Sequence, residues 1–384
     1  MRVCFFGTYE QNYVRNLTLI EGLRLQGWDV QECHVPVWEN ERNKTGKYLK
    51  TFSLVLRGLM LVVAYMRLLF QYFFTVRPYD VLLVGYIGHL DIPLAWLLTR
   101  IPRRPLVFSP LISLYDTLID DRQVFSRLSL MGRFLKWLDR WACNRSDLVL
   151  LDTEAHIRYF SDTFDLPHEK FVRVFVGSYG LQSVPRPPVS ENEPFRVVFL
   201  GKFTPLHGLD VMIRAAVLLK EEPGVEFHFV GSGQLSGEVH ASVGQLALPN
   251  VHFIDWIAYE KIPEFMARMD ACLGIFGTSG KALRVIPSKV FLALSLGKPV
   301  ITADTPAIRE LLTHGETAFL CEPGNPAALS ETILQARRNR HLLDSIGRTG
   351  YRLYLQQTSV ACIGPVVTTA IEKLFLPLKL DRGR

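Results

Sequence analysis

The chain has 384 residues, 48% of them hydrophobic, and its 43 Lys and Arg residues outnumber 37 Asp and Glu residues to give a net charge of +6. Its mean hydropathy of +0.16 is high for a soluble enzyme. At roughly 100 to 200 residues per domain, this length predicts two domains, and the composition excludes a disordered chain or a disulfide-stapled miniature scaffold. The six cysteines form no CxxC pair and no zinc-binding spacing. We therefore expect reduced thiols, and a cytoplasmic protein because the apolar start is too short for a signal peptide.

The positive charge is concentrated in residues 42–104, which hold ten basic residues and two acidic ones. Within this region, residues 52–76 are almost entirely apolar, and they predict a long helix. No uncharged stretch reaches the roughly 18 to 20 residues of a membrane span, because three polar residues interrupt the run: Arg57, Arg67 and Gln71.

We expect this helix to lie in the interface of an anionic membrane, with apolar side chains buried and arginines reaching the headgroups. A helix buried in the core with its arginines at the rim is the alternative. Three lysines directly before the helix favour the membrane: Lys44, Lys47 and Lys50. Nucleic acid is disfavoured as a partner, because the aromatic residues here follow a helical pattern and not the alternating face of a strand.

Short apolar strands alternate with amphipathic helices along most of the chain, a pattern typical of a parallel sheet wrapped by helices. In the N-terminal half the first strand ends at Gly7, and a helix with one apolar face then runs to Gly27. Strands are predicted at residues 3–6, 30–35, 81–84, 106–108, 148–151 and 172–175. This N-terminal domain spans residues 1–182.

A proline-rich linker at residues 183–194 precedes a second alternation, which forms a domain over residues 195–358. Its strands are predicted at residues 195–200, 226–230, 251–254, 271–275 and 300–302. The last helix, about 359–384, is a candidate to pack back on the first domain. The sequence thus predicts an α/β fold of two Rossmann-like domains facing across a cleft, with ligands beyond the carboxyl ends of the strands.

The loop after the strand at 195–200 is the first candidate binding element. It contains Gly201, Lys202 and His207 just before a helix begins. Cationic side chains beside the backbone N–H groups of a helix N-terminus favour an anion such as a diphosphate. The alternative is a surface turn, with Lys202 solvated and His207 capping the helix.

The next two strands end in a glycine pair and a tryptophan. Gly231 and Gly233 allow a ligand to approach the backbone closely, but the pattern is not GxGxxG, and NAD is therefore disfavoured. Trp256 follows the strand at 251–254, where it is placed to flank a nucleobase. A tryptophan packed in the core is the alternative.

A glycine-rich loop and a helix start form the third element. The helix is expected to begin with Pro287 in its first turn. Three cations and a serine lie close to this start: Lys281, Arg284, Ser288 and Lys289. An acidic cluster at 116–121 lacks the DxD spacing of a metal site, and we expect it to cap a helix starting at Arg122.

Together these elements resemble the nucleotide-sugar domain of retaining glycosyltransferases with the GT-B architecture, most closely family 4 (glycosyl transferases group 1). The family uses a basic pair, usually Arg and Lys, to hold the donor diphosphate, and Lys202 and His207 stand at those positions. His207 is cationic only if its pKa is held up. Gly7 resembles the family's N-terminal loop. The resemblance implies a nucleoside-diphosphate sugar as co-substrate, a lipid-linked or glycan acceptor, retention, and neither a metal nor another cofactor.

Two departures from the family pattern concern acidic residues. The family carries paired glutamates eight residues apart around the donor sugar and ribose, and this chain has Arg284 and Leu292 there. The loss of such a ligand weakens binding by about 1 to 3 kcal/mol. An acceptor-side histidine is not evident in the loop at 109–112, which leaves His89 as the candidate, with a structural role as its alternative.

The leading hypothesis is transfer of a sugar to a membrane-associated acceptor at the inner face of a membrane, as in the assembly of cell-envelope polysaccharides. The missing glutamates motivate a second hypothesis, a catalytically impaired relative that binds a nucleotide sugar or a partner enzyme. A sugar-nucleotide epimerase ranks last, because the sequence shows no acid and base set for it.

Overall fold

The computed structural model describes residues 1–38, 51–185, 193–222 and 224–376, with only the backbone described for residues 51–57. The three lysines at 44, 47 and 50 and most of the predicted linker lie outside these residues. The chain divides into two compact units. Unit 1 contains Met1–Tyr179 and the C-terminal segment from Val360, and unit 2 contains Gly180–Ser359.

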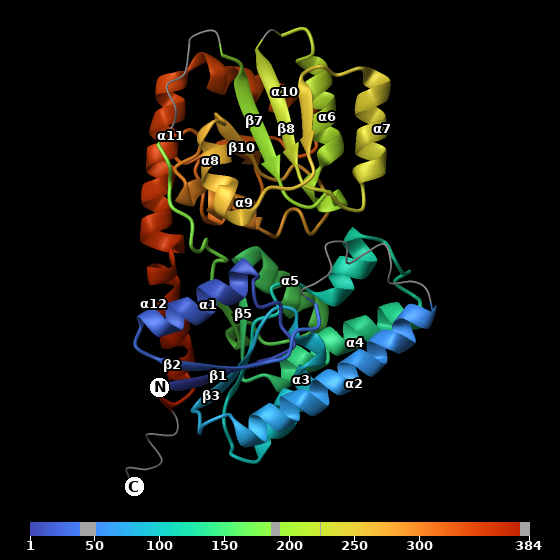
Figure 1. The fold of residues 1–384 in the computed structure, drawn as a ribbon, viewed down its shortest axis with the longest axis vertical. Coiled ribbons are helices and arrows are strands. Elements are labelled where there is room, and N and C mark those ends of the chain that lie inside the picture. Colours follow the sequence, from blue (N-terminus) through green and yellow to red (C-terminus); the bar gives the residue numbers. More distant parts are fainter. Residues whose placement is uncertain (39–50, 186–192, 223, 377–384) are drawn as a thin grey trace. The chain divides into compact units, whose positions relative to one another are not determined.

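Unit 1 is built on a parallel sheet with the strand order β2-β1-β3-β4-β5-β6. Its strands are β1 (Arg2–Gly7), β2 (Asp29–His34), β3 (Val81–Val84), β4 (Leu106–Phe108), β5 (Leu148–Leu151) and β6 (Phe171–Arg173). Its helices are α1 (Val14–Leu25), α2 (Thr51–Phe74), α3 (Ile92–Arg100), α4 (Leu130–Arg145), α5 (Glu154–Phe164) and α12 (Val360–Lys373) (Figure 1).

Helices cover both faces of this sheet, and alternate residues of β1 enter two different cores. Val3 and Phe5 pack with α1 and α12. Cys4 and Phe6 point to the other face and pack with residues of α2, α3, α4 and α5. Successive side chains of a strand point to opposite faces, so a strand that is buried on both faces reads as a continuous apolar run.

The C-terminal helix α12 packs along α1, and the two backbones meet at a pair of glycines. A Cβ on Gly22 would lie 3.1 Å from the Cα of Gly364, and a Cβ on Gly364 would overlap the carbonyl oxygen of Gly22. Ile363 and Val367 of α12 are buried in the core that α1 shares. The last helix is therefore an integral part of unit 1, although it follows the whole of unit 2 in the sequence.

Unit 2 contains a second parallel sheet, with the order β12-β11-β10-β7-β8-β9. Its strands are β7 (Phe195–Leu200), β8 (Val225–Val230), β9 (Val251–Ile254), β10 (Ala271–Leu273), β11 (Val300–Ala303) and β12 (Phe319–Cys321). Its helices are α6 (Leu209–Leu218), α7 (Ser236–Leu246), α8 (Ile262–Ala267), α9 (Ser288–Ser295), α10 (Pro326–Arg338) and α11 (Arg340–Leu353).

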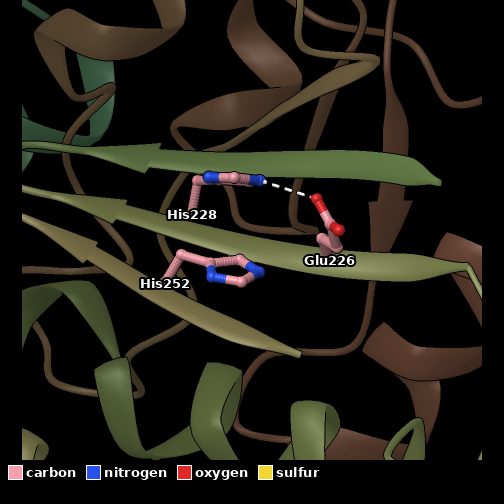
Figure 2. Close-up of side chains that lie close together, drawn as sticks. All are labelled: Glu226, His228 and His252. Atoms are coloured by element: carbon pink, nitrogen blue, oxygen red, sulfur yellow. Dashed lines mark hydrogen bonds and ion pairs between the residues drawn. The ribbon is translucent and has the colours of Figure 1, made fainter. Parts of the chain in front are cut away.

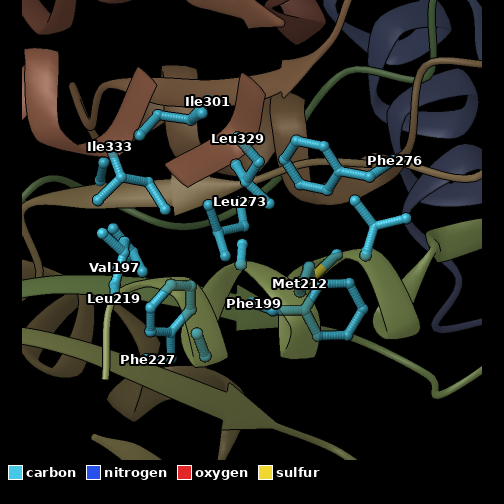
Figure 3. Packing of buried hydrophobic residues seen from close by; sticks show 14 of the residues in the cluster. Val197, Phe199, Met212, Leu219, Phe227, Leu273, Phe276, Ile301, Leu329 and Ile333 are labelled. Atoms are coloured by element: carbon cyan, nitrogen blue, oxygen red, sulfur yellow. The ribbon is translucent and has the colours of Figure 1, made fainter. Parts of the chain in front are cut away.

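One core of unit 2 lies between the sheet and the helices α6 and α10 (Figure 3). Val197 and Phe199 of β7 and Phe227 of β8 point into it and meet Met212 of α6 and Leu329 of α10. This packing leaves the opposite side chains of β8, such as Glu226 and His228, on the other face of the sheet.

The predicted α/β class with two Rossmann-like halves is confirmed by the two parallel sheets. Each strand expected from the sequence is present to within a few residues. The short strand β12 was not predicted. The expected helix from Arg122 is wrong: residues Asp116–Asp121 form a π-helical turn, and the next α-helix begins at Leu130 with Ser129 as its cap.

The long apolar helix predicted at 52–76 is α2. Only a narrow stripe of it, including Ala64 and Leu68, is buried in the core of unit 1. Within the residues that the structure describes, we find no helix that combines enough length with enough apolar character to cross a bilayer.

Candidate functional site

Three loops of unit 2 pack against one another at the carboxyl edge of its sheet, after β7, β8 and β10. A Cβ on Gly233 would lie 2.6 Å from the backbone nitrogen of Phe203, and a Cβ on Gly208 would lie 2.5 Å from that of Gly277. Gly231 adopts a φ of +132° and lies against the carbonyl of Gly201. Only glycine fits these positions, so the glycines shape the loops by backbone contact.

Lys289, in the first turn of α9, directs its ammonium group to this edge of the sheet. The residue is only 4% exposed, and Nζ lies 3.6 Å from the centre of the Phe199 ring. A Cβ on Gly201 would lie 3.2 Å from Nζ. Among the described residues, none supplies a hydrogen-bond acceptor to this nitrogen. Burial lowers the pKa of Lys289 well below its usual value.

An ammonium group with three donors and no acceptor is an expensive group to bury. Its position at the N-terminus of α9 adds the positive end of that helix dipole to the same edge. The arrangement therefore favours an anion between the loops after β7 and β10.

The other predicted cations of unit 2 lie on the same loops. Lys281 is buried, and its charge acts on His207 together with that of Lys289. The Arg284 guanidinium folds over Gly280, whose Cβ would lie 2.7 Å from one of its nitrogens. Lys202 and Ser288 are exposed. The structure thus places the charges of Lys281 and Lys289 near His207, and it places Lys202 and Arg284 on loops at the same edge of the sheet.

His207 differs from the expected cation. The ring is buried, and its Nδ1 lies 2.7 Å from the carbonyl oxygen of Lys202 and 3.2 Å from Thr204 Oγ1. Burial lowers the pKa of His207 well below its usual value, and the nearby charges of Lys289 and Lys281 lower it further. The ring is therefore neutral, donates from Nδ1 to the carbonyl and fixes the loop. It does not present the second cation that the basic pair of the family provides.

Trp256 lies after β9 on the same edge of the sheet and is 61% exposed. This exposure excludes the alternative of a core tryptophan. A large aromatic ring at the solvent edge of a binding loop is suited to stacking against a planar ligand.

In unit 1, Gly7 ends β1 and lies against the carboxylate of Asp91. Asp91 is buried, accepts a hydrogen bond of 2.7 Å from the backbone N–H of Thr8 and another of 3.0 Å from the Thr8 hydroxyl. Burial raises the pKa of Asp91 to about 7. These contacts hold the loop after β1 in place, so Gly7 is required there by the close approach of Asp91.

His89 lies in a short 3₁₀ helix after β3, as expected, but it is buried. Its Nε2 lies 3.1 Å from the carbonyl oxygen of Ile112 and 3.4 Å from a carboxylate oxygen of Asp139. Burial lowers the pKa of His89. These contacts favour the structural alternative over direct contact with an acceptor.

One cluster of potential metal ligands in the described residues was missed from the sequence: Glu226, His228 and His252. Two of these residues are separated by one position on β8, which places them on one face. The third comes from β9, and only the register between the two strands brings it close. The sequence shows the first relation but not the second.

The fold of both units is that of the GT-B glycosyltransferases. The structure of Anabaena Alr3699/HepE, solved in complex with UDP, superimposes with a TM-score of 0.67 at 18% identity, over 97% of this chain and 100% of that one. Sucrose-phosphate synthase from Thermosynechococcus elongatus superimposes with a TM-score of 0.72 at 15% identity, over 98% and 99% of the two chains. At these identities the likeness shows the fold alone.

Residues 194–339 match the family model described as glycosyl transferases group 1, so unit 2 carries a domain of that family. The chain is also 25% identical over 148 residues to the amylovoran biosynthesis glycosyltransferase AmsK of Erwinia amylovora. That alignment covers 38% of this chain and 36% of AmsK, which is little more than a third of either protein.

Proposed function

We propose that the chain is a retaining glycosyltransferase that takes a sugar from a nucleoside-diphosphate donor bound at the carboxyl edge of the unit 2 sheet. The observation that carries the proposal is the buried ammonium of Lys289, which lies beside Gly201 with no acceptor among the described residues. A diphosphate would supply the missing acceptors. The group 1 domain at 194–339 and the UDP-bound structures of the same fold support this assignment.

The cations of this site would act on the leaving group. Departure of a nucleoside diphosphate leaves an oxocarbenium-like sugar and places negative charge on the phosphate. Fixed cations at Lys202, Lys281 and Lys289 lower the barrier because their attraction grows as this charge develops. The same phosphate can take the proton of the acceptor hydroxyl, so that the reaction needs neither a carboxylate base nor a metal ion and proceeds with retention.

Substitution of Lys202 tests this function. Turnover of UDP-glucose and other nucleotide sugars with a membrane-lipid acceptor should be lost in Lys202→Ala, while the circular dichroism spectrum stays unchanged. Lys220→Ala is the matched control, because Lys220 lies two residues beyond the end of α6 at Leu218, at the opposite end of that helix from the loop. Unchanged turnover in Lys202→Ala would refute the assignment.

The acceptor proposed for the enzyme is a lipid-linked saccharide at an anionic membrane, and the exposed face of α2 supports it. More than half of each side chain is exposed along this face, up to 74% at Phe74: Leu59, Met60, Val62, Val63, Met66, Phe70, Phe73 and Phe74. A shallow groove of about 400 Å³ on this face is lined by four apolar residues and by Arg67 and Gln71. Such a large apolar area is unusual on a monomeric soluble protein.

Exposed apolar residues are also found on α4, and α3 connects this helix to α2 in unit 1. Tyr65 and Tyr72 of α2 donate hydrogen bonds to carbonyls of the segment around α3, and Trp96 of α3 contacts Trp141 of α4. The exposed apolar residues on and just before α4, with Leu130 84% exposed, are Leu128, Leu130, Met131, Phe134 and Trp137. We infer that α2 and α4 together lie against the membrane, so that the enzyme is peripheral at its inner face and acts in the synthesis of an envelope polysaccharide.

Leu292 keeps the second candidate open, a catalytically impaired relative that only binds a nucleotide sugar or a partner. It lies on α9 three residues after Lys289, where a glutamate would pair with the ammonium. If the parent chain binds nucleoside diphosphates but transfers no sugar, and Leu292→Glu does not restore transfer, this candidate replaces the enzyme. Transfer by the parent chain excludes it.

A further inference from the structure

Glu226, His228 and His252 gather on one face of the unit 2 sheet, away from the loops described above (Figure 2). Glu226 and His228 lie on β8, and His252 is the register partner of His228 on the neighbouring strand β9. On β8, Glu226 lies five positions before Gly231 and His228 lies three positions before it, which is about 16 Å and about 10 Å along an extended strand. The cluster is therefore distinct from the proposed donor site.

The backbone holds the three side chains close together. One ligand atom from each residue lies within 4.8 Å of the other two. His228 Nε2 and Glu226 Oε2 are 3.2 Å apart, and the two imidazole rings are stacked with their centres 4.9 Å apart. Hydrogen-bonded strands are rigid supports, and they position ligands more closely than loops do.

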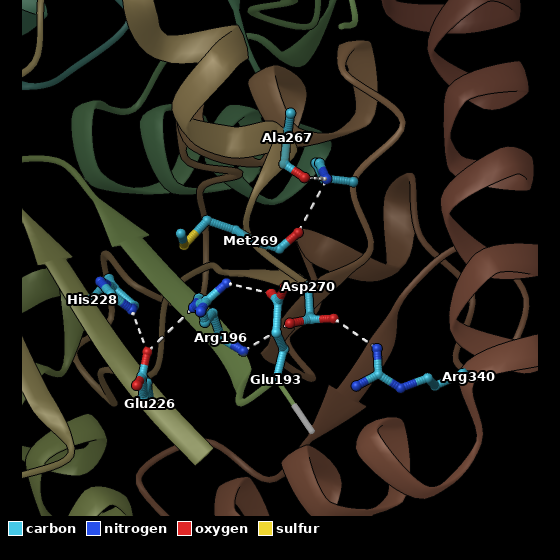
Figure 4. Close-up of polar contacts among 9 residues, drawn as sticks. Glu193, Arg196, Glu226, His228, Ala267, Met269, Asp270 and Arg340 are labelled. Carbon is cyan, nitrogen blue, oxygen red and sulfur yellow. Dashed lines mark hydrogen bonds and ion pairs between the residues drawn. The ribbon is translucent and has the colours of Figure 1, made fainter. Parts of the chain in front are cut away.

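The charges around the cluster favour a cation. Glu226 Oε2 also accepts a hydrogen bond of 3.3 Å from Arg196 Nε. Arg196 is shared, because one of its terminal nitrogens lies 3.0 Å from Glu193 (Figure 4). The two carboxylates and one guanidinium leave an excess of negative charge beside two imidazoles.

We propose that Glu226, His228 and His252 bind a divalent transition-metal ion, with Zn²⁺ as the best-matched ion. Two imidazoles and one carboxylate are a ligand set that zinc uses with a fourth position open to water. Bonds of about 2.0 to 2.2 Å hold the ligand atoms of a tetrahedral ion roughly 3.3 to 3.6 Å apart. The side chains reach this spacing by closing by about an ångström, and His228 moves its proton from Nε2 to Nδ1.

The site is accessible and has a mechanical consequence for the sheet. The side chains of His228 and Glu226 are 15% and 30% exposed, so an ion can enter from solvent. A bound ion would link β8 to β9, which is the last strand of the sheet. Metal binding should therefore raise the melting temperature of unit 2, and it plays no part in the sugar transfer proposed above.

The experiment is a Zn²⁺ titration of the full chain by isothermal calorimetry, after removal of metals with EDTA and exchange into chelator-free buffer. We expect one Zn²⁺ per chain, and a loss of affinity of about tenfold to a hundredfold in His228→Ala, in His252→Ala and in Glu226→Gln. His341→Ala is the control, because His341 is an exposed histidine on α11 of the same unit. Mg²⁺, which prefers oxygen ligands, should not compete.

Arg196→Gln provides a test in the opposite direction. It removes a cation beside Glu226 and should tighten Zn²⁺ binding, by up to about tenfold, which a merely destabilised protein would not do. The visible absorption of bound Co²⁺ should report nitrogen and oxygen ligands and disappear in a double variant lacking both histidines. Absence of stoichiometric Zn²⁺ binding, or equal affinity in that double variant and the parent, would overturn the proposal.

Discussion

Replacement of Lys289 by methionine should stabilise the unliganded protein and weaken its binding of a nucleoside diphosphate. Methionine has a similar length, adapts to the cavity beside Phe199 and brings no unsatisfied donor. Burial holds the pKa of Lys289 far below its usual value. At pH values between this lowered pKa and the ordinary pKa of lysine, the unfolded chain therefore binds more protons than the folded chain, and this linkage lowers the stability of the folded state there.

The size of the effect follows from the cost of a buried polar group without a partner. That cost is about 1 to 3 kcal/mol, and a shift of 1 kcal/mol moves the melting temperature of a domain of this size by about 2 to 4 °C. Unit 2 of Lys289→Met should therefore melt about 2 to 12 °C higher without ligand. A lost charge-assisted hydrogen bond of about 1.5 to 3 kcal/mol should weaken UDP binding by about ten- to hundredfold.

Differential scanning calorimetry of the parent and the variant, with and without UDP, measures both effects. The parent should be stabilised by UDP by about 2.7 kcal/mol at a hundred times its Kd, and the variant much less at the same concentration. Raising the pH toward the ordinary pKa of lysine should stabilise the unliganded parent relative to the variant. A variant that melts lower than the parent without ligand, or binds UDP equally well, would refute the reasoning.

Three further predictions concern the site, the surface and the packing. A bound diphosphate raises the lowered pKa of Lys289, so UDP binding should take up a proton and weaken as the pH rises. Calorimetric titrations with UDP in several buffers test this, and binding heats that do not depend on the ionisation enthalpy of the buffer would contradict it. The double substitution Met66→Glu and Phe70→Glu should reduce binding to anionic vesicles by at least about tenfold, because each apolar side chain contributes about 1.5 to 3 kcal/mol when buried. Co-sedimentation with the vesicles measures this binding. Leu25→Glu is the control, because Leu25 is exposed on α1 of the same unit. Gly364→Ala should destabilise unit 1 by about 1 to 3 kcal/mol in urea unfolding, because its Cβ overlaps the backbone of Gly22; an unchanged midpoint would refute the close packing of α12 on α1.

The strands of both sheets could be predicted from the sequence because a parallel sheet buried on both faces produces short continuous apolar runs. β12, at Phe319–Cys321, was missed, although β4 is equally short and was predicted. The helix expected at Arg122 failed because an acidic cluster resembles a cap, whereas Asp116 and Asp121 are buried within a π-helical turn.

The candidate site shows the same division between local and non-local information. Glycines and cations near helix starts are local signals, and Gly201, Gly233 and Lys289 could be found from them. The neutral state of His207 depends on its burial and on two lysines about 75 and 80 positions further along the chain. No local pattern reports that environment. The pairing of His228 with His252 likewise depends on strand register, which a single sequence does not determine.

The measurement that tests the central claim most directly is calorimetric binding of matched nucleosides, nucleoside monophosphates and nucleoside diphosphates to the full chain. The buried ammonium of Lys289 and the charge of Lys281 predict that one nucleoside diphosphate binds at least about a hundredfold more tightly than its nucleoside, because two charge-assisted contacts each contribute about 1.5 to 3 kcal/mol. Equal affinities across such a series, or no binding of any diphosphate, would contradict the account.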